Sequence, residues 1–323
     1  MLEYSNTPPH CSLLPLFSAP TLLLLHCTAP PTVHALQLIQ TLNSRNAVET
    51  FQLVNQLLTK YPTTMSNVVT TLAMPMITQL FYVMPTCVPR SNNHTSPTSD
   101  QVLSESLQKV YVLFVTNITS NNLSNVFLTD TSLPYLNQIF TTLLAACTNV
   151  PDPNVCKQVY MILKQVTEQW LGGIKSTNIS NGRKNGNTSN GGGHEDRFPC
   201  NVPVKAKQLL VNVLMGEGTT ATFVMLQTCV RYGYDKSDAA MTLSMHKEVI
   251  AFQQVVVLYL GQQYIEHVVG LLLSRLHLQP NVAQQYRMCL TPNTTTTNVA
   301  TNTTNKQFRK FFATLMEDLN KRG

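Results

Sequence analysis

Residues 151–173 read PDPNVCKQVYMILKQVTEQWLGG. Apolar side chains recur in this stretch at intervals of three and four residues, at Val155, Val159, Ile162, Val166 and Trp170. This spacing places them on one face of an α-helix. Asp152 is a suitable N-cap, Pro153 suits the first helical turn, and the pair Gly172-Gly173 ends the helix. The stretch therefore predicts a capped amphipathic helix with one buried face.

The same spacing recurs from about residue 33 onward. Examples are Phe51, Val54 and Leu58; Leu103, Leu107, Val110 and Phe114; and Leu136, Phe140, Leu143 and Cys147. The β-branched run 255–257 lies inside the long apolar segment Ala239–Leu278, which fits one or two helices better than a strand. A helix pair with its turns takes about 40 residues, the size of a HEAT unit. The pattern predicts an all-α fold, a HEAT-repeat α-solenoid in which antiparallel helix pairs stack into a superhelix. The alternative is a compact helical bundle.

Segments poor in apolar residues divide the chain. The stretches 175–197 and 291–305 are rich in Asn, Thr, Ser and Gly and bury too little apolar surface to offset the entropy of ordering. We therefore expect six parts: a poorly ordered N-terminal segment 1–32, HEAT-like helix pairs in 33–174, a disordered insert 175–197, C-terminal HEAT-like helices in 198–290, a second disordered insert 291–305, and a terminal helix 306–323.

The charge of the chain is unevenly distributed. Charged residues make up 12% of the 323 residues, and the formal net charge is +6. Residues 1–174 contain six Lys and Arg against seven acids, whereas residues 175–323 contain sixteen against nine, a balance of +7. Such asymmetry fits either a polyanionic partner for the C-terminal half or a modest excess of solvated cations.

No pattern of residues predicts catalysis, a cofactor or a metal site. The eight cysteines are scattered without a Cys-x-x-Cys pair, which is typical of free buried thiols. The glycine run 191–193 does not lie between a strand and a helix, so it is not a phosphate loop. His194, Glu195 and Asp196 stand beside that run, where nothing holds their geometry. The sequence is therefore expected not to be that of an enzyme.

The sequence does not predict secretion or membrane insertion. The apolar runs at 13–17 and 22–25 have no Lys or Arg before them, and Pro15 and Pro20 interrupt them. A secretory signal begins with a basic region. No stretch reaches the roughly 20 unbroken apolar residues that a spanning helix needs.

The order of these features resembles the C-terminal portion of the exportin-T family. The strongest match is the stretch 151–173, with its Pro-Asp-Pro opening, Ile-Leu-Lys core and Trp-Leu-Gly ending. Ala35–Ile39, Ala73–Ile77 with its internal proline, and Gln101–Thr119 precede it in the same order. The terminal stretch Lys306–Arg322, with its three phenylalanines, is similar to the family's final helix.

The resemblance implies a receptor that carries tRNA out of the nucleus. Its partners would be tRNA, the Ran GTPase in its GTP form and the nucleoporins of the pore, and it would shuttle between nucleus and cytoplasm. Lys and Arg would neutralise phosphates of a folded RNA without reading its bases. The basic residues expected to do so are Lys205, Lys207, Arg231, Lys306, Arg309 and Lys310. The alternative is a HEAT-repeat scaffold, or another karyopherin-like factor, that binds proteins and no RNA.

Overall fold

The structure is a computed structural model, and it describes residues 31–84, 98–172, 202–216, 219–232, 238–291 and 298–321. Within these ranges the regular structure is helical and no strand occurs, so the all-α prediction is confirmed. The helices are α1 (Pro31–Gln40), α2 (Ser44–Lys60), α3 (Pro62–Val83), α4 (Ser99–Ser120), α5 (Leu136–Asn149), α6 (Pro153–Leu171), α7 (Val204–Met215), α8 (Ala221–Tyr232), α9 (Ala239–Leu260), α10 (Gln262–Ser274), α11 (Pro280–Leu290) and α12 (Asn298–Asn320), with 3₁₀ turns η2 (Ser124–Phe127) and η3 (Leu133–Tyr135).

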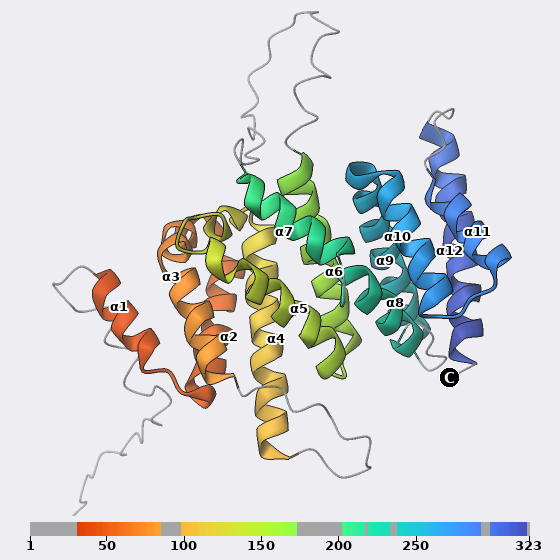
Figure 1. The fold of residues 1–323 in the computed structure, drawn as a ribbon. Coiled ribbons are helices and arrows are strands. Elements are labelled where there is room, and N and C mark those ends of the chain that lie inside the picture. Colours follow the sequence, from red (N-terminus) through yellow and green to blue (C-terminus); the bar gives the residue numbers. More distant parts are fainter. Residues whose placement is uncertain are drawn as a thin grey trace, which may run out of the picture.

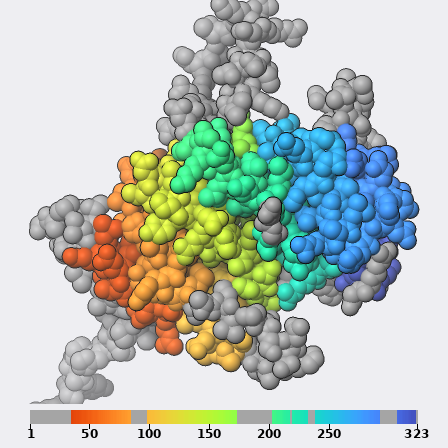
Figure 2. Space-filling view, in the orientation of Figure 1, coloured from red at the N-terminus to blue at the C-terminus, as the bar shows by residue number. Residues whose placement is uncertain are grey.

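The helices follow one another in space as they do in sequence. Figure 1 shows α1 at one end of an elongated array and α12 at the other, and the space-filling view in Figure 2 has the same progression of colours. Neighbours along the chain, such as α2 and α3, α5 and α6, and α9 and α10, pack on each other as antiparallel pairs. This is the HEAT-type α-solenoid that the sequence predicted.

Helix α6 begins and ends where its sequence indicates. The Asp152 carboxylate accepts a hydrogen bond from the backbone N–H of Asn154 at 3.0 Å, which satisfies one of the free N–H groups of the first turn. Pro153 occupies that turn, and Gly172 is the C-cap. A Cβ atom at Gly172 would lie 2.9 Å from the Tyr259 hydroxyl of α9, so this glycine also permits close packing of the next repeat.

Alternate helices form a layer of parallel helices. Helix α2 packs on α4, α4 on α6, and α6 on α9. In the first contact, the rings of Phe51 and Phe114 meet edge to face with centroids 5.1 Å apart. One turn further along both helices, the Asn117 amide donates to the Asn55 side-chain oxygen at 3.0 Å. The two contacts advance in the same direction on α2 and α4, so these helices run parallel.

The later helices of the layer keep this direction. Lys109 of α4 pairs with Asp152 at 3.1 Å, and Ser120 near the end of α4 contacts Gln165 further along α6. On the opposite flank of α6, Lys164 lies 3.8 Å from Glu248 of α9, and further along both helices Gly172 lies beside Tyr259. The repeated parallel stacking is what a solenoid requires, because each repeat buries its apolar surface against the next one.

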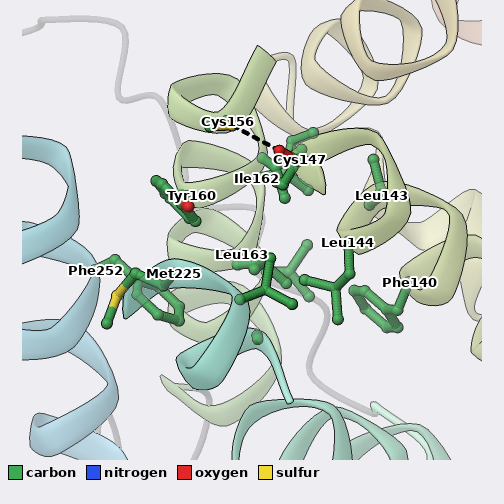
Figure 3. Close-up of a cluster of buried hydrophobic side chains, with 14 of the residues drawn as sticks. Phe140, Leu143, Leu144, Cys147, Cys156, Tyr160, Ile162, Leu163, Met225 and Phe252 are labelled. Carbon is green, nitrogen blue, oxygen red and sulfur yellow. Dashed lines mark hydrogen bonds between the residues drawn. The ribbon is translucent and has the colours of Figure 1, made fainter. Parts of the chain in front are cut away.

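Helix α6 is buried on two sides, by its pair partner α5 and by α9 of a later repeat. Figure 3 shows Phe140 and Leu144 of α5 on one side of it, and Phe252 of α9 on the other. Tyr160 of α6 stacks on Phe252 with ring centroids 6.3 Å apart, and its hydroxyl shares a hydrogen bond with the Thr228 hydroxyl of α8. The buried polar group is therefore satisfied within the core.

The structure changes one boundary that the sequence suggested. The terminal helix was expected to begin at residue 306, after a disordered insert 291–305, but α12 begins at Asn298. Extending an existing helix costs less free energy than nucleating one, so a helix anchored further along continues into residues that would not form one alone. Residues 1–30 of the expected N-terminal segment 1–32, the whole insert 175–197 and residues 292–297 of the second insert lie outside the described residues. The helices expected in 198–290 are α7 to α11.

In the sequence, no apolar stretch is long enough for a membrane-spanning helix. None of the helices in the described ranges combines the length and the apolar character that crossing a membrane demands.

Trp170 is fully buried at the end of α6. Its ring contacts the ring of Phe140 of α5 edge to face, with centroids 6.0 Å apart. The indole N–H has no hydrogen-bond acceptor among the described residues. The side chain therefore stabilises the α5–α6 pair through apolar burial alone, as the position of Trp170 on the apolar stripe predicted.

We expect Trp170→Ala to lower the free energy of unfolding by about 3–5 kcal/mol, because it removes a large buried ring and leaves a cavity. Trp170→Phe should cost much less, since it keeps most of the apolar contact and removes a buried unpaired donor. Urea unfolding followed by circular dichroism measures both. Tyr82→Ala, at a side chain that is 85% exposed, is the matched control. Equal stability of wild type and Trp170→Ala would contradict the packing role.

Candidate nucleic-acid interface

Three basic residues project from α12. Lys306, Arg309 and Lys310 are exposed, whereas Phe308 and Phe312, which alternate with them, are fully buried. The Phe308 ring meets the Tyr286 ring of α11 at 5.5 Å between centroids. The helix is thus held by its aromatic face, and the three cations are turned to solvent.

Two further candidates, Lys205 and Lys207, stand in the first turn of α7. Lys205 is exposed and Lys207 is half-buried. The free backbone N–H groups of a first turn add partial positive charge to that of the two side chains. This end of α7 therefore carries positive charge, and a role of Lys205 and Lys207 in RNA binding stays a prediction.

Arg231 has a structural contact that the sequence did not indicate. It lies in the last turn of α8, and its guanidinium donates to the backbone carbonyl of Thr148 at 3.2 Å. Thr148 lies in the last turn of α5, where carbonyl groups have no partner within the helix. Arg231 thus joins the ends of α8 and α5, two helices of adjacent repeats.

The structure does not bring the six candidates together. Helix α7 packs on α5, α6 and α8, whereas α12 packs on α8, α9 and α11. Figure 1 places α7 in the middle of the array and α12 at its far end. The three cations on α12 form a single group, Lys205 and Lys207 form another, and Arg231 is part of the α5–α8 contact.

Most described acids of the C-terminal half already have partners. Glu248 pairs with Lys164, and Asp238 caps α9 by accepting from the Met241 backbone N–H at 2.8 Å. The other ion pairs are Glu266–Arg287 at 2.6 Å and Glu317–Lys321 at 3.0 Å. The cations on α12 at positions 306, 309 and 310 have no ion pair to any described residue, so no described acid neutralises their charge.

A comparison with protein families decides what kind of protein carries this array. The family model described as Exportin-T matches residues 29–320, nearly the whole chain. The chain belongs to the exportin-T family. Searches of the curated proteins and of the solved structures found no match. Exportins are karyopherin-type transport receptors and not an enzyme family, which agrees with the resemblance in the sequence.

Sequence reasoning did not single out Lys247, an exposed cation of this exportin-T chain. Lys247 lies on α9 inside the apolar segment 239–278, next to Glu248. In the sequence, the charge of Lys247 is balanced by that of the neighbouring Glu248. In the helix the two side chains do not lie together, because adjacent residues point about 100° apart and so face different neighbours. Lys247 is exposed, while Glu248 faces α6.

Three cysteines of the core surround Tyr160 without forming a chemical site. Cys147, Cys156 and Cys229 are buried and free, and the Cys156 thiol donates to the Cys147 backbone carbonyl at 3.3 Å. Burial in apolar surroundings raises the pKa of the Cys147 and Cys229 thiols well above the usual range. In the described ranges no cluster of His, Cys, Asp or Glu could hold a metal ion. These thiols serve as small apolar side chains.

We expect Cys147, Cys156 and Cys229 to resist thiol reagents in the native protein, because all three sulfur atoms are buried. The raised pKa of the Cys147 and Cys229 thiols makes their reactive thiolate scarce as well. Cys289, which is only partly buried, should react faster. Labelling with iodoacetamide, followed by peptide mass spectrometry, compares the four sites. In 8 M urea all four should react at similar rates. Native labelling of Cys147 as fast as that of Cys289 would contradict the packing described here.

Proposed function

We propose that this protein is a tRNA nuclear export receptor that binds tRNA together with Ran in its GTP form. The observation that carries the proposal is the group Lys306, Arg309 and Lys310, turned outward by buried phenylalanines in a chain of the exportin-T family. The uneven charge, +7 after residue 174, supports it.

Phosphate contacts supply the affinity in this mechanism. Each Lys or Arg that neutralises a phosphate releases condensed counterions, so binding strengthens as salt is lowered. Side chains cannot read the deep, narrow major groove of an A-form duplex, so double-helical RNA is recognised mostly by its shape and backbone. The three cations on α12 present charge without a stacking partner, which suits backbone recognition.

The parts of the proposal that concern Ran and the nuclear pore rest on membership of the exportin-T family. Ran-GTP would stabilise the conformation of the superhelix that holds RNA, and GTP hydrolysis would remove that preference. Contacts with nucleoporins would carry the complex through the pore, so the receptor would be present in both nucleus and cytoplasm. A helical solenoid suits such switching, because each repeat contacts only its neighbours and small changes add up along the array.

A protein-binding scaffold without RNA binding is the second candidate. It is favoured by an apolar stripe that starts at Tyr61, the N-cap of α3, and continues along the helix. Tyr61 and Val68 are exposed, and Met65 and Leu72 are partly buried. These positions are spaced four, three and four residues apart, so they lie on one face of the helix. The two candidates differ in whether RNA binds at all.

We expect the triple variant Lys306→Ala, Arg309→Ala, Lys310→Ala to keep its fold and lose tRNA affinity. The slope of log K against log salt should become shallower by about 0.7–0.9 for each phosphate contact removed. Filter binding of labelled tRNA across a salt series measures affinity and slope, and thermal melting checks the fold.

The matched control removes three cations from the N-terminal half: Arg45→Ala, Lys60→Ala, Lys157→Ala. It changes the net charge equally but leaves α12 intact, so it should bind almost as wild type does. Equal loss in both triple variants would show a general charge effect. Absence of tRNA binding by wild type at low salt, with binding of a helical protein partner, would favour the scaffold.

A further inference from the structure

The apolar stripe on α3 continues a face of that helix that α1 covers further along. Gln79 of α3 donates from its side-chain amide to the Leu42 backbone carbonyl at 3.0 Å, just after the end of α1. Gln79 follows Leu72 by seven residues, or two helical turns, so both side chains lie on one face of α3. The first half of this face is here called the α3 stripe: Tyr61, Met65, Val68 and Leu72.

Helix α1 runs parallel to α3 and begins beside its middle. The end of α1 lies at Gln79, near the last turn of α3, and α1 packs on α3. It must therefore extend back toward the start of α3, and Figure 1 shows the two helices side by side. The 10 residues of α1 span about 15 Å and the 22 residues of α3 about 33 Å. The α3 stripe thus extends beyond the start of α1 at Pro31.

The α3 stripe is apolar, exposed and without charge. Tyr61 is 57% exposed and Val68 is 42% exposed, while Met65 and Leu72 pack partly on the core. None of the 22 residues of α3 is charged. Burial of exposed apolar surface is favourable by about 25 cal/mol per Å². The α3 stripe therefore suits an uncharged apolar segment and has no charge with which to bind a phosphate.

A segment of this kind precedes α1 in the sequence. Residues 22–25 are four consecutive leucines, and no Lys, Arg, Asp or Glu occurs from residue 4 to residue 44. Residues 26–30 connect the leucines to Pro31. Five extended residues span about 17 Å, which is also about the length of the α3 stripe from residue 61 to residue 72. The leucines are therefore within reach of the α3 stripe from the start of α1.

We propose that residues 22–25 dock on the α3 stripe of the same chain and bury Tyr61 and Val68. The two surfaces match in apolar character, in absence of charge and in reach. This docking completes the apolar packing at the α1 end of the array. The cations of α12 lie at the opposite end, so the docking is independent of RNA binding (Figure 1). The surface that favours the scaffold candidate is then occupied by the chain itself.

The test replaces Val68 by photoreactive benzoylphenylalanine in the full chain. Irradiation followed by peptide mass spectrometry should identify a crosslink to residues 20–28. The same probe at Thr70 is the matched control and should give no such crosslink. Thr70 is exposed, and two residues place it about 200° around the helix from Val68. A mixture of ¹⁵N-labelled and unlabelled chains separates crosslinks within one chain from those between copies.

A quadruple variant removes the docking side chains without changing a described residue: Leu22→Ser, Leu23→Ser, Leu24→Ser and Leu25→Ser. In this variant the crosslink from position 68 should fall several-fold. Amide hydrogen exchange across residues 61–72 should become several-fold faster, because the covering segment is lost. Thermal melting checks that the array itself stays folded.

Three results would overturn the inference. Crosslinks between labelled and unlabelled chains would mean that a second copy covers the α3 stripe. Equal crosslinking to residues 20–28 from positions 68 and 70 would mean that the contact is unspecific. Equal amide exchange in wild type and the quadruple variant would mean that the leucines leave the α3 stripe open to a separate protein.

Discussion

The burial of α6 on both of its flanks is the interaction on which the rest of the structure depends. Its apolar residues cover most of its circumference, so no single partner helix could remove them from water. Trp170 packs on Phe140 of α5, while Tyr160 packs on Phe252 of α9 and hydrogen-bonds to Thr228 of α8. Helices before and after α6 in the chain must therefore both be in place before its burial is complete, which favours an array over an isolated pair.

Polar contacts between repeats are mainly uncharged. Asn55 bonds to Asn117 and to the Val110 carbonyl, and Ser124 donates to Gln169. Amides and hydroxyls can be buried at lower cost than ions, provided that they are hydrogen-bonded. This agrees with a chain in which only 12% of residues are charged. The unpaired cations at the α12 end stand out against this background, and that contrast makes them the candidate interface.

Much of the fold was predictable from local patterns. The capped helix at 151–173, the burial of Trp170, the helices within 239–278 and the buried Phe308 and Phe312 follow from apolar spacing and capping residues, and all are present. The start of α12 at Asn298 was not predictable, because polar Asn and Thr residues give no helical signal of their own. The contact between Arg231 and Thr148 was not predictable either, since 83 residues separate the partners in sequence.

The sequence by itself determined that the chain is all-α, where most of its helices lie, which of their faces are buried, and that positive charge is concentrated after residue 174. The helices and their buried faces follow from apolar residues spaced three or four apart. The charge balance follows from counting Lys, Arg, Asp and Glu along the chain. Only the tertiary structure decided which cations are neighbours. It separated Lys205 and Lys207 from α12, placed Arg231 in a contact between α8 and α5, and left Lys247 exposed while Glu248 faces Lys164. The reason is that a charge acts through distances in space, and in a solenoid those distances are set by how successive repeats pack.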